Sequence, residues 1–321
     1  MRWTPLAFAA ALAISSMAQT VSAGPVLPIT KASDHPLAGQ VIKTATGRAL
    51  DPAGLLAALA GADVVVLGEV HDNAEHHMAQ AWLVSELAPA ALAFEMIPRG
   101  MEGVLERLRA EGAPLAVIGA ALEWESRGWP DWGLYAPILA AAPDAPITGG
   151  ELGREASALA MREGAEAAAR RGIGAAARLY RLDRPFDSET QAAAVAQQVA
   201  AHCDAIPEHV GERMVEAQRL RDAAFADAVL RARALGEDGL VALIAGSGHA
   251  RIDRGAPLFL NKARPDLSVV SLAMVEAREG AYDWRGYAQG PGDAAPVFDF
   301  VWFTAPAVRE DPCEAFLRSR R

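Results

Sequence analysis

Short apolar runs alternate with helical patterns through the first half of this chain. Residues 63–67 (DVVVL) and 90–96 (AALAFEM) have the length and the β-branched or apolar composition of buried strands. A helical pattern follows each run, over about 73–87 and 99–110. This strand–helix alternation predicts a parallel sheet whose strands are joined by right-handed crossover helices.

The second half of the chain is richer in helix and also contains further strands. The runs with strand character lie at 145–149, 240–245, 268–274 and 298–303. We expect the last of them, FDFVWF, to be an edge strand, and long helices at about 188–203 and 207–235. The predicted fold class is α/β, with a central mostly parallel sheet flanked by helices and a helical insertion or cap. Residues 24–321 are expected to form a single domain.

The first 23 residues have the pattern of a secretory signal peptide. Arg2 supplies a positive start, residues 6–14 form a short apolar run, and Val21-Ser22-Ala23 is a small-x-small cleavage sequence. A membrane anchor is the alternative, but the apolar run is too short to span a bilayer. We therefore expect an exported, periplasmic protein cleaved near Ala23. No lipobox cysteine stands at that point, so lipid anchoring is not indicated.

Composition and charge narrow the possible functions. Of the 321 residues 52 % are hydrophobic, enough for a sizeable core, and the formal net charge is −10. An acidic chain without a basic stripe is a poor partner for nucleic acid, because phosphate contacts need clustered positive charge. Nucleic-acid binding is therefore not expected.

The chain has two cysteines, Cys203 and Cys313. In an exported protein with no third cysteine, a disulfide between them is the favoured interpretation. Two free thiols remain the alternative, since the sequence gives no distance between the two residues.

Polar residues with ligand chemistry stand directly after three of the apolar runs. Two Gly-x-x-His sequences, at 68–71 and 246–249, each follow a strand, and Glu95 ends the strand between them. Ligands of open parallel sheets bind at the carboxyl ends of strands, where the loops converge. Glycine lets the backbone turn tightly, so we expect the side chains that follow it to face one cavity.

These residues are a chemically plausible set when they are taken together. Glu69, His71, Glu95 and His249 could hold a divalent metal or serve as general acids and bases. Each alone has an ordinary structural explanation, because a single histidine is more often a hydrogen-bonding residue and a carboxylate such as Asp72 often caps a helix. His76 and His77 follow in the next helix and are expected to support the site rather than to form it.

Five ordered blocks between about residues 39 and 274 resemble the ChaN-like haem-binding proteins. The blocks are GEVHDNAEHHMAQAWLVSEL, FEM, WESRGWPDWGLYAPIL, HCDAIPEHVGERMVEAQRLRDAAFADAVL and IAGSGHARIDRGAP. That family is related to the Tiki metalloproteases and the erythromycin esterases. The resemblance implies an α/β fold, haem bound cofacially at a homodimer interface, a role in haem or iron acquisition or storage, and outer-membrane uptake machinery as a possible partner.

The resemblance also implies roles for particular residues. The shared superfamily site corresponds to Glu69, His71, Glu95 and His249 in this sequence. In the haem-binding branch, a tyrosine and a histidine are expected at the iron. Tyr135 is the preferred tyrosine, because it lies in a matching block beside two tryptophans. Its alternative is an ordinary packing contact, and the other tyrosines are Tyr180, Tyr282 and Tyr287.

Further residues could complete a haem site under this hypothesis. Trp129 and Trp132 could line the porphyrin slot, and Arg127 or Arg99 could meet a propionate. His202 and His209 lie in another matching block and are candidates for the histidine partner.

The matching block that ends in RDAAFADAV departs from the family at one position. Phe225 stands where a methionine is expected, an apolar change that should be tolerated. Arg221 and Asp222 remain and are expected to form an ion pair beside the cavity, with an ordinary surface pair as the alternative.

Two functions therefore compete. The first is an exported haem-binding protein, with haem as its cofactor, and it rests on the family resemblance. The second is a hydrolase that depends on a divalent metal held by Glu69, His71, Glu95 and His249, and it rests on the strand-end pattern.

Overall fold

The computed structural model describes Met1 and residues 33–290 and 295–319. The expected signal peptide, apart from Met1, therefore lies outside the described residues. Within those ranges, no helix has both the length and the apolar character needed to cross a membrane.

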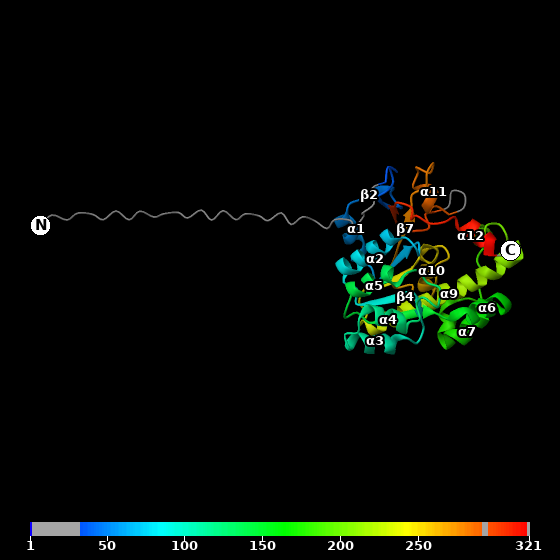
Figure 1. Cartoon of the computed structure of the whole chain (residues 1–321), viewed down its shortest axis with the longest axis horizontal. Coiled ribbons are helices and arrows are strands. Elements are labelled where there is room, and N and C mark those ends of the chain that lie inside the picture. Colours follow the sequence, from blue (N-terminus) through cyan, green and yellow to red (C-terminus); the bar gives the residue numbers. More distant parts are fainter. Residues whose placement is uncertain (2–32, 291–294, 320–321) are drawn as a thin grey trace.

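A mostly parallel sheet forms the centre of the molecule (Figure 1). Its described strands are β1 Val41–Lys43, β2 Arg48–Leu50, β3 Val64–Glu69, β4 Ala91–Pro98, β5 Ile147–Glu151, β6 Val241–Gly246, β7 Val269–Glu276 and β8 Phe300–Thr304. The strand order is β2-β1-β8-β7-β3-β6-β4-β5. Strands β3 to β8 all run parallel to one another, whereas the β1–β2 hairpin is antiparallel and pairs with β8 in antiparallel fashion. The predicted α/β class is confirmed.

Helices cover both faces of this sheet. They are α1 Pro52–Leu59, α2 Ala74–Leu87, α3 Glu102–Ala110, α4 Leu115–Ala121, α5 Trp132–Ala141, α6 Gly153–Glu163, α7 Ala165–Gly172, α8 Ser188–Ala201, α9 Glu208–Leu235, α10 Ala256–Ala263, α11 Arg285–Ala288 and α12 Pro312–Ser319, with 3₁₀ turns at Gly174–Tyr180 (η1) and Ser247–Ala250 (η2). Alternate residues of β3 face opposite sides: Val64 and Val66 pack with α6, α7, α9 and α10, and Val65 and Leu67 pack with α1, α2, α4 and α5. A strand buried on both faces reads as a continuous apolar run, which is why β3 was visible in the sequence.

The expectation that residues 298–303 form an edge strand is wrong. Strand β8 lies between β1 and β7, because the β1–β2 hairpin adds to its outer side. Each hairpin strand has only three residues, too few to give a periodic pattern in the sequence.

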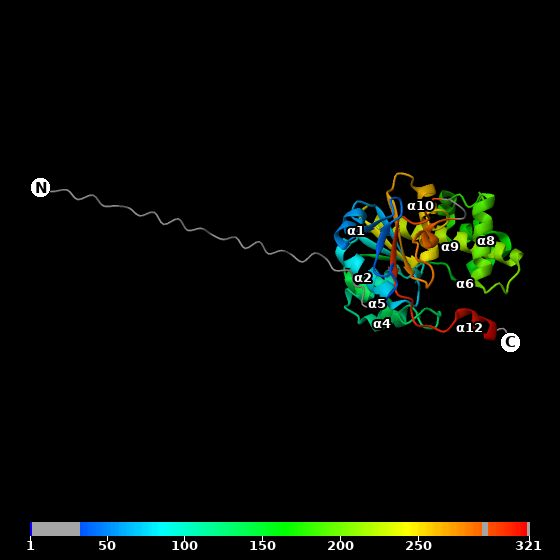
Figure 2. The ribbon, with the colours of Figure 1, turned by 90° about the horizontal axis from the view of Figure 1, so that it is seen from above.

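Helix α8 packs against the N-terminal half of α9, away from the sheet (Figure 2). A small separate core joins these two helices through Ala194, Val195 and Val215. The predicted disulfide between Cys203 and Cys313 is present, with the two Cα atoms 5.5 Å apart. It ties α12 to the end of the α8–α9 lobe.

Candidate functional site

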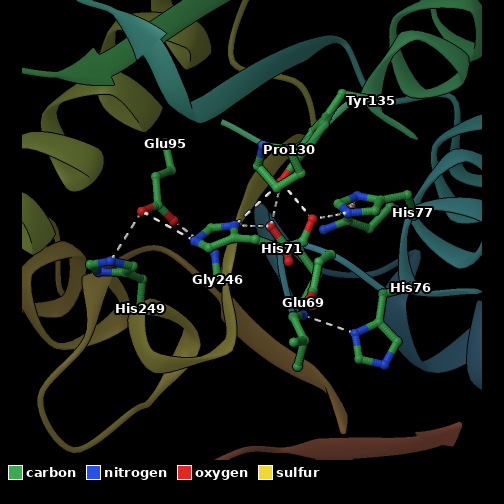
Figure 3. Close-up of polar contacts among 12 residues, drawn as sticks. Glu69, His71, His76, His77, Glu95, Pro130, Tyr135, Gly246 and His249 are labelled. Atoms are coloured by element: carbon green, nitrogen blue, oxygen red, sulfur yellow. Dashed lines mark hydrogen bonds and ion pairs between the residues drawn. The ribbon is translucent and has the colours of Figure 1, made fainter. Parts of the chain in front are cut away.

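The two Gly-x-x-His loops and Glu95 meet at the carboxyl ends of three adjacent strands (Figure 3). Glu69 is the last residue of β3, Glu95 lies near the end of β4, and His249 is in the 3₁₀ turn that follows β6. The parallel pairing of β3 with β6 and of β6 with β4 brings these ends together. We define Glu69, His71, Glu95 and His249 as the strand-end cluster.

His71 is the accessible member of this cluster. Its Nδ1 lies 2.6 Å from Glu69 Oε1, and Tyr135 donates a hydrogen bond of 3.1 Å to the same oxygen. Glu69 and Tyr135 are buried, whereas the His71 side chain is 37 % exposed. The buried carboxylate therefore fixes the ring through Nδ1, and Nε2 faces Glu95 Oε1 at 3.9 Å.

His249 is the buried counterpart. Its Nδ1 lies 2.6 Å from Asp222 Oδ1, and its Nε2 lies 3.3 Å from Glu95 Oε1. Asp222 comes from α9, which also supplies Gln218, whose amide nitrogen is 3.0 Å from His249 Nδ1. The ring is held between two buried carboxylates.

Glu95 connects the two histidines. Its Oε1 is 3.9 Å from His71 Nε2 and pairs closely with Arg221, and its Oε2 accepts a hydrogen bond of 2.8 Å from the Gly246 amide. Burial opposes the charged form of Glu95, but His249, Arg221 and His71 together hold its pKa well below the usual range. Glu95 is thus an anion shared by three cationic or protonatable groups.

The motif glycines are needed for close approach, and neither has a positive φ. A Cβ on Gly68 would lie 2.7 Å from Ala250 Cβ and 2.9 Å from Ser247 Cα, in the opposite loop. A Cβ on Gly246 would lie 3.2 Å from the His71 ring. Each glycine therefore makes room for the other motif, which corrects the expectation that they serve to turn the backbone.

Proton affinities at the cluster are shifted by these neighbours. Burial alone would lower the pKa of His71, but the hydrogen bond to Glu69 and the charges of Glu95 and Glu69 outweigh it and raise the pKa to about 9. For His249, burial is likewise outweighed by Glu95 and Asp222, so its pKa is also raised. The imidazolium form of His71 is therefore favoured at neutral pH, and that of His249 is favoured more than in a free histidine.

The expected metal site is not supported by this arrangement. Arg221 already places its guanidinium on Glu95 Oε1, the oxygen that faces both histidines. Within residues 33–290 and 295–319, no group of three or more histidine, cysteine or acidic residues has an arrangement that could hold a metal ion. The residues form an ion-paired network instead of an open set of metal ligands.

His76 and His77 support the first motif through its backbone, as expected. His76 Nδ1 accepts a hydrogen bond of 2.8 Å from the Val70 amide, and its Nε2 lies 2.8 Å from Thr304 Oγ1. Burial lowers the pKa of His76 to about 3, so this ring is neutral. His77 Nε2 lies 2.9 Å from the carbonyl oxygen of His71. The two rings therefore fix the backbone of the loop.

Tyr135 lies beneath the cluster and not on an open surface. It is fully buried, and burial together with Glu69 raises the pKa of its hydroxyl far above the usual value. A tyrosinate ligand to haem iron must be exposed and deprotonated, so this position does not suit the role expected for Tyr135. The other tyrosine between residues 55 and 260, Tyr180, is also fully buried.

The two histidines expected to partner the tyrosine lie elsewhere. His202 ends α8 next to the disulfide, and its Nδ1 contacts the carbonyl oxygen of Gln198. His209 is exposed in the first turn of α9. At 1.5 Å per residue, it is about 20 Å along the helix from Asp222, so it does not approach the strand-end cluster.

The residues expected to line a haem slot also separate. Trp129 packs edge-on against His71, with ring centroids 5.3 Å apart, whereas Trp132 faces a different hollow bordered by Glu123, Glu125 and Asp131. That acidic border is unsuited to haem carboxylates. Arg127 and Arg99 are already paired, with Glu151 and Asp227 respectively.

A cleft of about 340 Å³ opens beside the strand-end cluster. The sequence pattern pointed to Glu95, Trp129 and Arg221 among its lining residues. It did not point to Phe225, or to Leu152, Arg154, Ala158 and Met161 of the segment from β5 into α6. The exposed area of the cleft is mainly apolar, and Arg154 and Arg221 supply positive charge. Glu95 and Glu151 also line the cleft and are paired with Arg221 and Arg127. The Gly149-Gly150 pair at the end of β5 was the available signal, since it also marks a strand end at this edge of the sheet.

Comparisons with known proteins agree with this architecture. The family described as "Haem-binding uptake, Tiki superfamily, ChaN" matches residues 55–260. The solved structure "Cofacial heme binding to ChaN of Campylobacter jejuni" aligns with a TM-score of 0.58 at 18 % identity and covers 82 % of this chain and 95 % of that chain. This similarity shows a shared fold.

Two other solved structures align less closely with this chain. "The structure of the type III effector HopBA1" aligns with a TM-score of 0.44 at 11 % identity, covering 88 % of this chain and 100 % of that one. A mutant of the erythromycin esterase EreC, solved in its open conformation, aligns with a TM-score of 0.35 at 14 % identity, covering 83 % of this chain and 82 % of that one. No curated protein matches the sequence. The family match spans more than half of the chain, and so this protein belongs to the ChaN family of the Tiki superfamily.

Proposed function

We propose that this protein binds haem in the cleft beside the strand-end cluster. The observation that carries the proposal is a mainly apolar cleft whose wall includes Trp129 and Glu95, two of the residues that lie against the partly exposed His71 ring. Haem needs an apolar slot, a ligand for its iron and cations for its propionates. The cleft and its borders supply residues of all three kinds.

His71 is the proposed iron ligand. Glu69 holds its Nδ1, and this hydrogen bond orients the imidazole for a metal at Nε2. Because the pKa of His71 is raised to about 9, binding of iron at Nε2 would release one proton from the ring. The tyrosines of the family region, Tyr135 and Tyr180, are both buried, and the exposed Tyr282 lies outside residues 55–260. Access therefore favours the histidine over every tyrosine in that region.

Arg154 is the proposed partner of the haem carboxylates, and Arg221, which is paired with Glu95, adds positive charge beside it. Both line the cleft, and Arg154 is exposed and makes no ion pair in the described structure. Leu152, Met161 and Phe225 supply apolar contacts for the porphyrin. When bound, haem would supply a redox-active iron, and the role of this chain would be to hold, orient and shield it.

A homodimer and export complete this proposal. A porphyrin is larger than the cleft, so part of its face would remain uncovered by one subunit, and a second copy would cover it. The Cys203–Cys313 disulfide is compatible with an oxidising compartment, and periplasmic haem or iron acquisition or storage, in contact with outer-membrane uptake machinery, is the proposed setting. Mature periplasmic protein should begin at Gly24 by N-terminal sequencing; protein that retains Met1 in the cytosol would contradict export.

Haemin titration tests the proposal. Absorption spectra of the wild-type chain should show saturable binding, and sedimentation should show a shift toward dimer. His71→Ala should weaken binding at least about tenfold, which corresponds to about 1.4 kcal/mol. Tyr135→Phe should keep the wild-type spectrum, and His209→Ala is the matched control for an exposed histidine. If Tyr135→Phe changes the spectrum and His71→Ala does not, the iron ligand is the tyrosine.

Acid–base hydrolysis without a metal is the second candidate function. It is favoured by a continuous series of contacts from Asp222 through His249 and Glu95 to the exposed His71. A protonated His71 could donate to a leaving group while Arg221 stabilises developing negative charge. Ester hydrolysis that resists chelators and is lost in both His71→Ala and Glu95→Gln would support it. Activity that depends on an added divalent metal would contradict it.

A further inference from the structure

The C-terminal segment 305–319, which we name the strap, lies along the first motif. It begins at the end of β8, and Figures 1 and 2 both show it leaving the sheet and reaching α12 near the helical lobe. Asn73 donates a hydrogen bond of 3.1 Å to the carbonyl oxygen of Ala305, and the amide of Ala307 donates one of 2.9 Å to Glu276. The strap therefore contacts the loop that carries His71 from its first residues onward.

Arg309 makes the strongest connection between the strap and this loop. Its guanidinium binds Asp72 through two contacts of 2.7 and 2.8 Å and also binds Glu276 at the end of β7. Asp72 directly follows His71 in the chain, and Asn73, the N-cap of α2, directly follows Asp72. Two consecutive residues after His71 are thus bonded to the strap.

The far end of the strap is fixed to the helices that support His249 and Glu95. Cys313 is bonded to Cys203 at the end of α8, and α8 packs on α9, the helix that supplies Gln218, Arg221 and Asp222 to His249 and Glu95. Residues 306–311 of the strap are exposed or only partly buried, and Val308 is almost fully exposed. The position of the strap depends on Arg309 and on the disulfide more than on packing.

We propose that Arg309 is a positioning residue for His71, and that the Cys203–Cys313 disulfide keeps it in place. Reduction of the disulfide releases the end of the strap. Ordering the freed segment then costs more conformational entropy, and this cost weakens the ion pairs of Arg309 with Asp72 and Glu276. The residues that follow His71 then lose their external support. The ligand-binding loop is in this way coupled to the redox state of its surroundings.

Hydrogen exchange of the full-length exported protein tests this proposal directly. Arg309→Gln, and separately the reduced and alkylated wild type, should each exchange the amides of residues 70–77 about fivefold faster, as expected for loss of a partly exposed charged contact. The amides of β4 and β6 should not change. Arg318→Gln is the matched control, because Arg318 lies on the same strap and pairs only with Glu310 and Glu314 in the described structure. Arg309→Lys should restore part of the protection.

The haemin readout rests on the proposed haem function, whereas the exchange readout does not. Haemin should dissociate about fivefold faster from Arg309→Gln and from the reduced protein than from Arg318→Gln, since most changes at one site appear in the dissociation rate. Unchanged exchange at 70–77 in both altered proteins, or an equal change in Arg318→Gln, overturns the positioning role. Failure of the wild type to bind haemin overturns the haem proposal instead, and the exchange result still decides the role of the strap.

Discussion

The two Gly-x-x-His motifs follow adjacent parallel strands and yet place their histidines in opposite environments. His71 stands in an open loop with Glu69 at Nδ1 and Glu95 at a longer 3.9 Å from Nε2, and 37 % of its side chain is exposed. His249 stands in a 3₁₀ turn beneath α9, with 6 % of its side chain exposed and carboxylates on both ring nitrogens. The same four-residue pattern thus gives one histidine that can meet a ligand and one that holds the site together.

The elements that follow the strands explain this difference. After His71 the chain enters α2, which Asn73 caps and which supports the backbone of the loop through His76 and His77. After His249 the chain stays close to β3 and β7, and α9 crosses over the ring with Gln218 and Asp222. The motif determines the position of each histidine, and the presence of a covering helix determines whether its ring is accessible to a ligand.

Removing each imidazole should give the largest contrast. His249→Ala leaves Asp222 and Glu95 as buried carboxylates without their shared partner, and the free energy of unfolding should fall by about 3 kcal/mol or more. His71→Ala should cost less than about 1 kcal/mol, since the ring is partly solvated. Urea unfolding measures both values, and equal losses would contradict the division between a structural and a ligand-facing histidine.

Substitution of the two motif glycines should give the next largest contrast. Gly68→Ala places a methyl group against backbone and Cβ atoms at 2.7–2.9 Å and should cost about 2–3 kcal/mol. Gly246→Ala meets the His71 ring at 3.2 Å, which can shift, and should cost about 1 kcal/mol. Gly103→Ala, with open space around it in α3, is the control and should not destabilise. Equal stability of all three variants would show that the loops do not need to pack closely.

Removal of the Asn73 cap, which is present only after the first motif, should have a smaller effect on the free energy of unfolding. Asn73→Ala removes the bond to the Glu75 amide and should cost about 1 kcal/mol. Asn73→Ser keeps a capping oxygen and should recover part of the loss, as measured by thermal unfolding. The turn after Gly246 has no side-chain cap, so the second motif offers no equivalent change. A Ser variant as unstable as the Ala variant would assign the effect to the contacts of Asn73 with Glu276 and Ala305 instead.

The pH dependence of the stability contributed by His71 should be the smallest of these effects. The pKa of His71 is raised to about 9 in the folded protein, above about 6.5 for an unfolded histidine. Its contribution to stability is therefore complete below about pH 6.5 and is lost as the pH rises through about 9. Because the side chain is more than a third exposed, solvent screening should keep this contribution below about 1 kcal/mol. The difference in unfolding free energy between wild type and His71→Gln, measured at both ends of this window, should shrink at high pH.

Local patterns in the chain were enough to predict the parallel strands, their order of appearance and the convergence of the cluster. Strands such as β3 and β6 are buried on both faces, so their apolar runs were visible without any contact information. Because parallel strands end at one edge, Glu69, His71, Glu95 and His249 had to meet there once those strands were adjacent. Two cysteines in a chain with an expected export signal likewise predicted the bond that is present.

The accessibility of these residues depends on packing between distant segments. Tyr135 and Trp132 lie close in sequence to Trp129, but the orientation of α5 buries Tyr135 under Glu69 and turns Trp132 to a different hollow. Arg221 and Arg154 come from α9 and α6, and their meeting at one cleft depends on how those helices cross the sheet. The three-residue strands of the β1–β2 hairpin gave no pattern, and their place beside β8 is set by long-range pairing. Side-chain exposure, ion pairing and pKa are properties of packed neighbours distant in sequence, and local periodicity does not contain them.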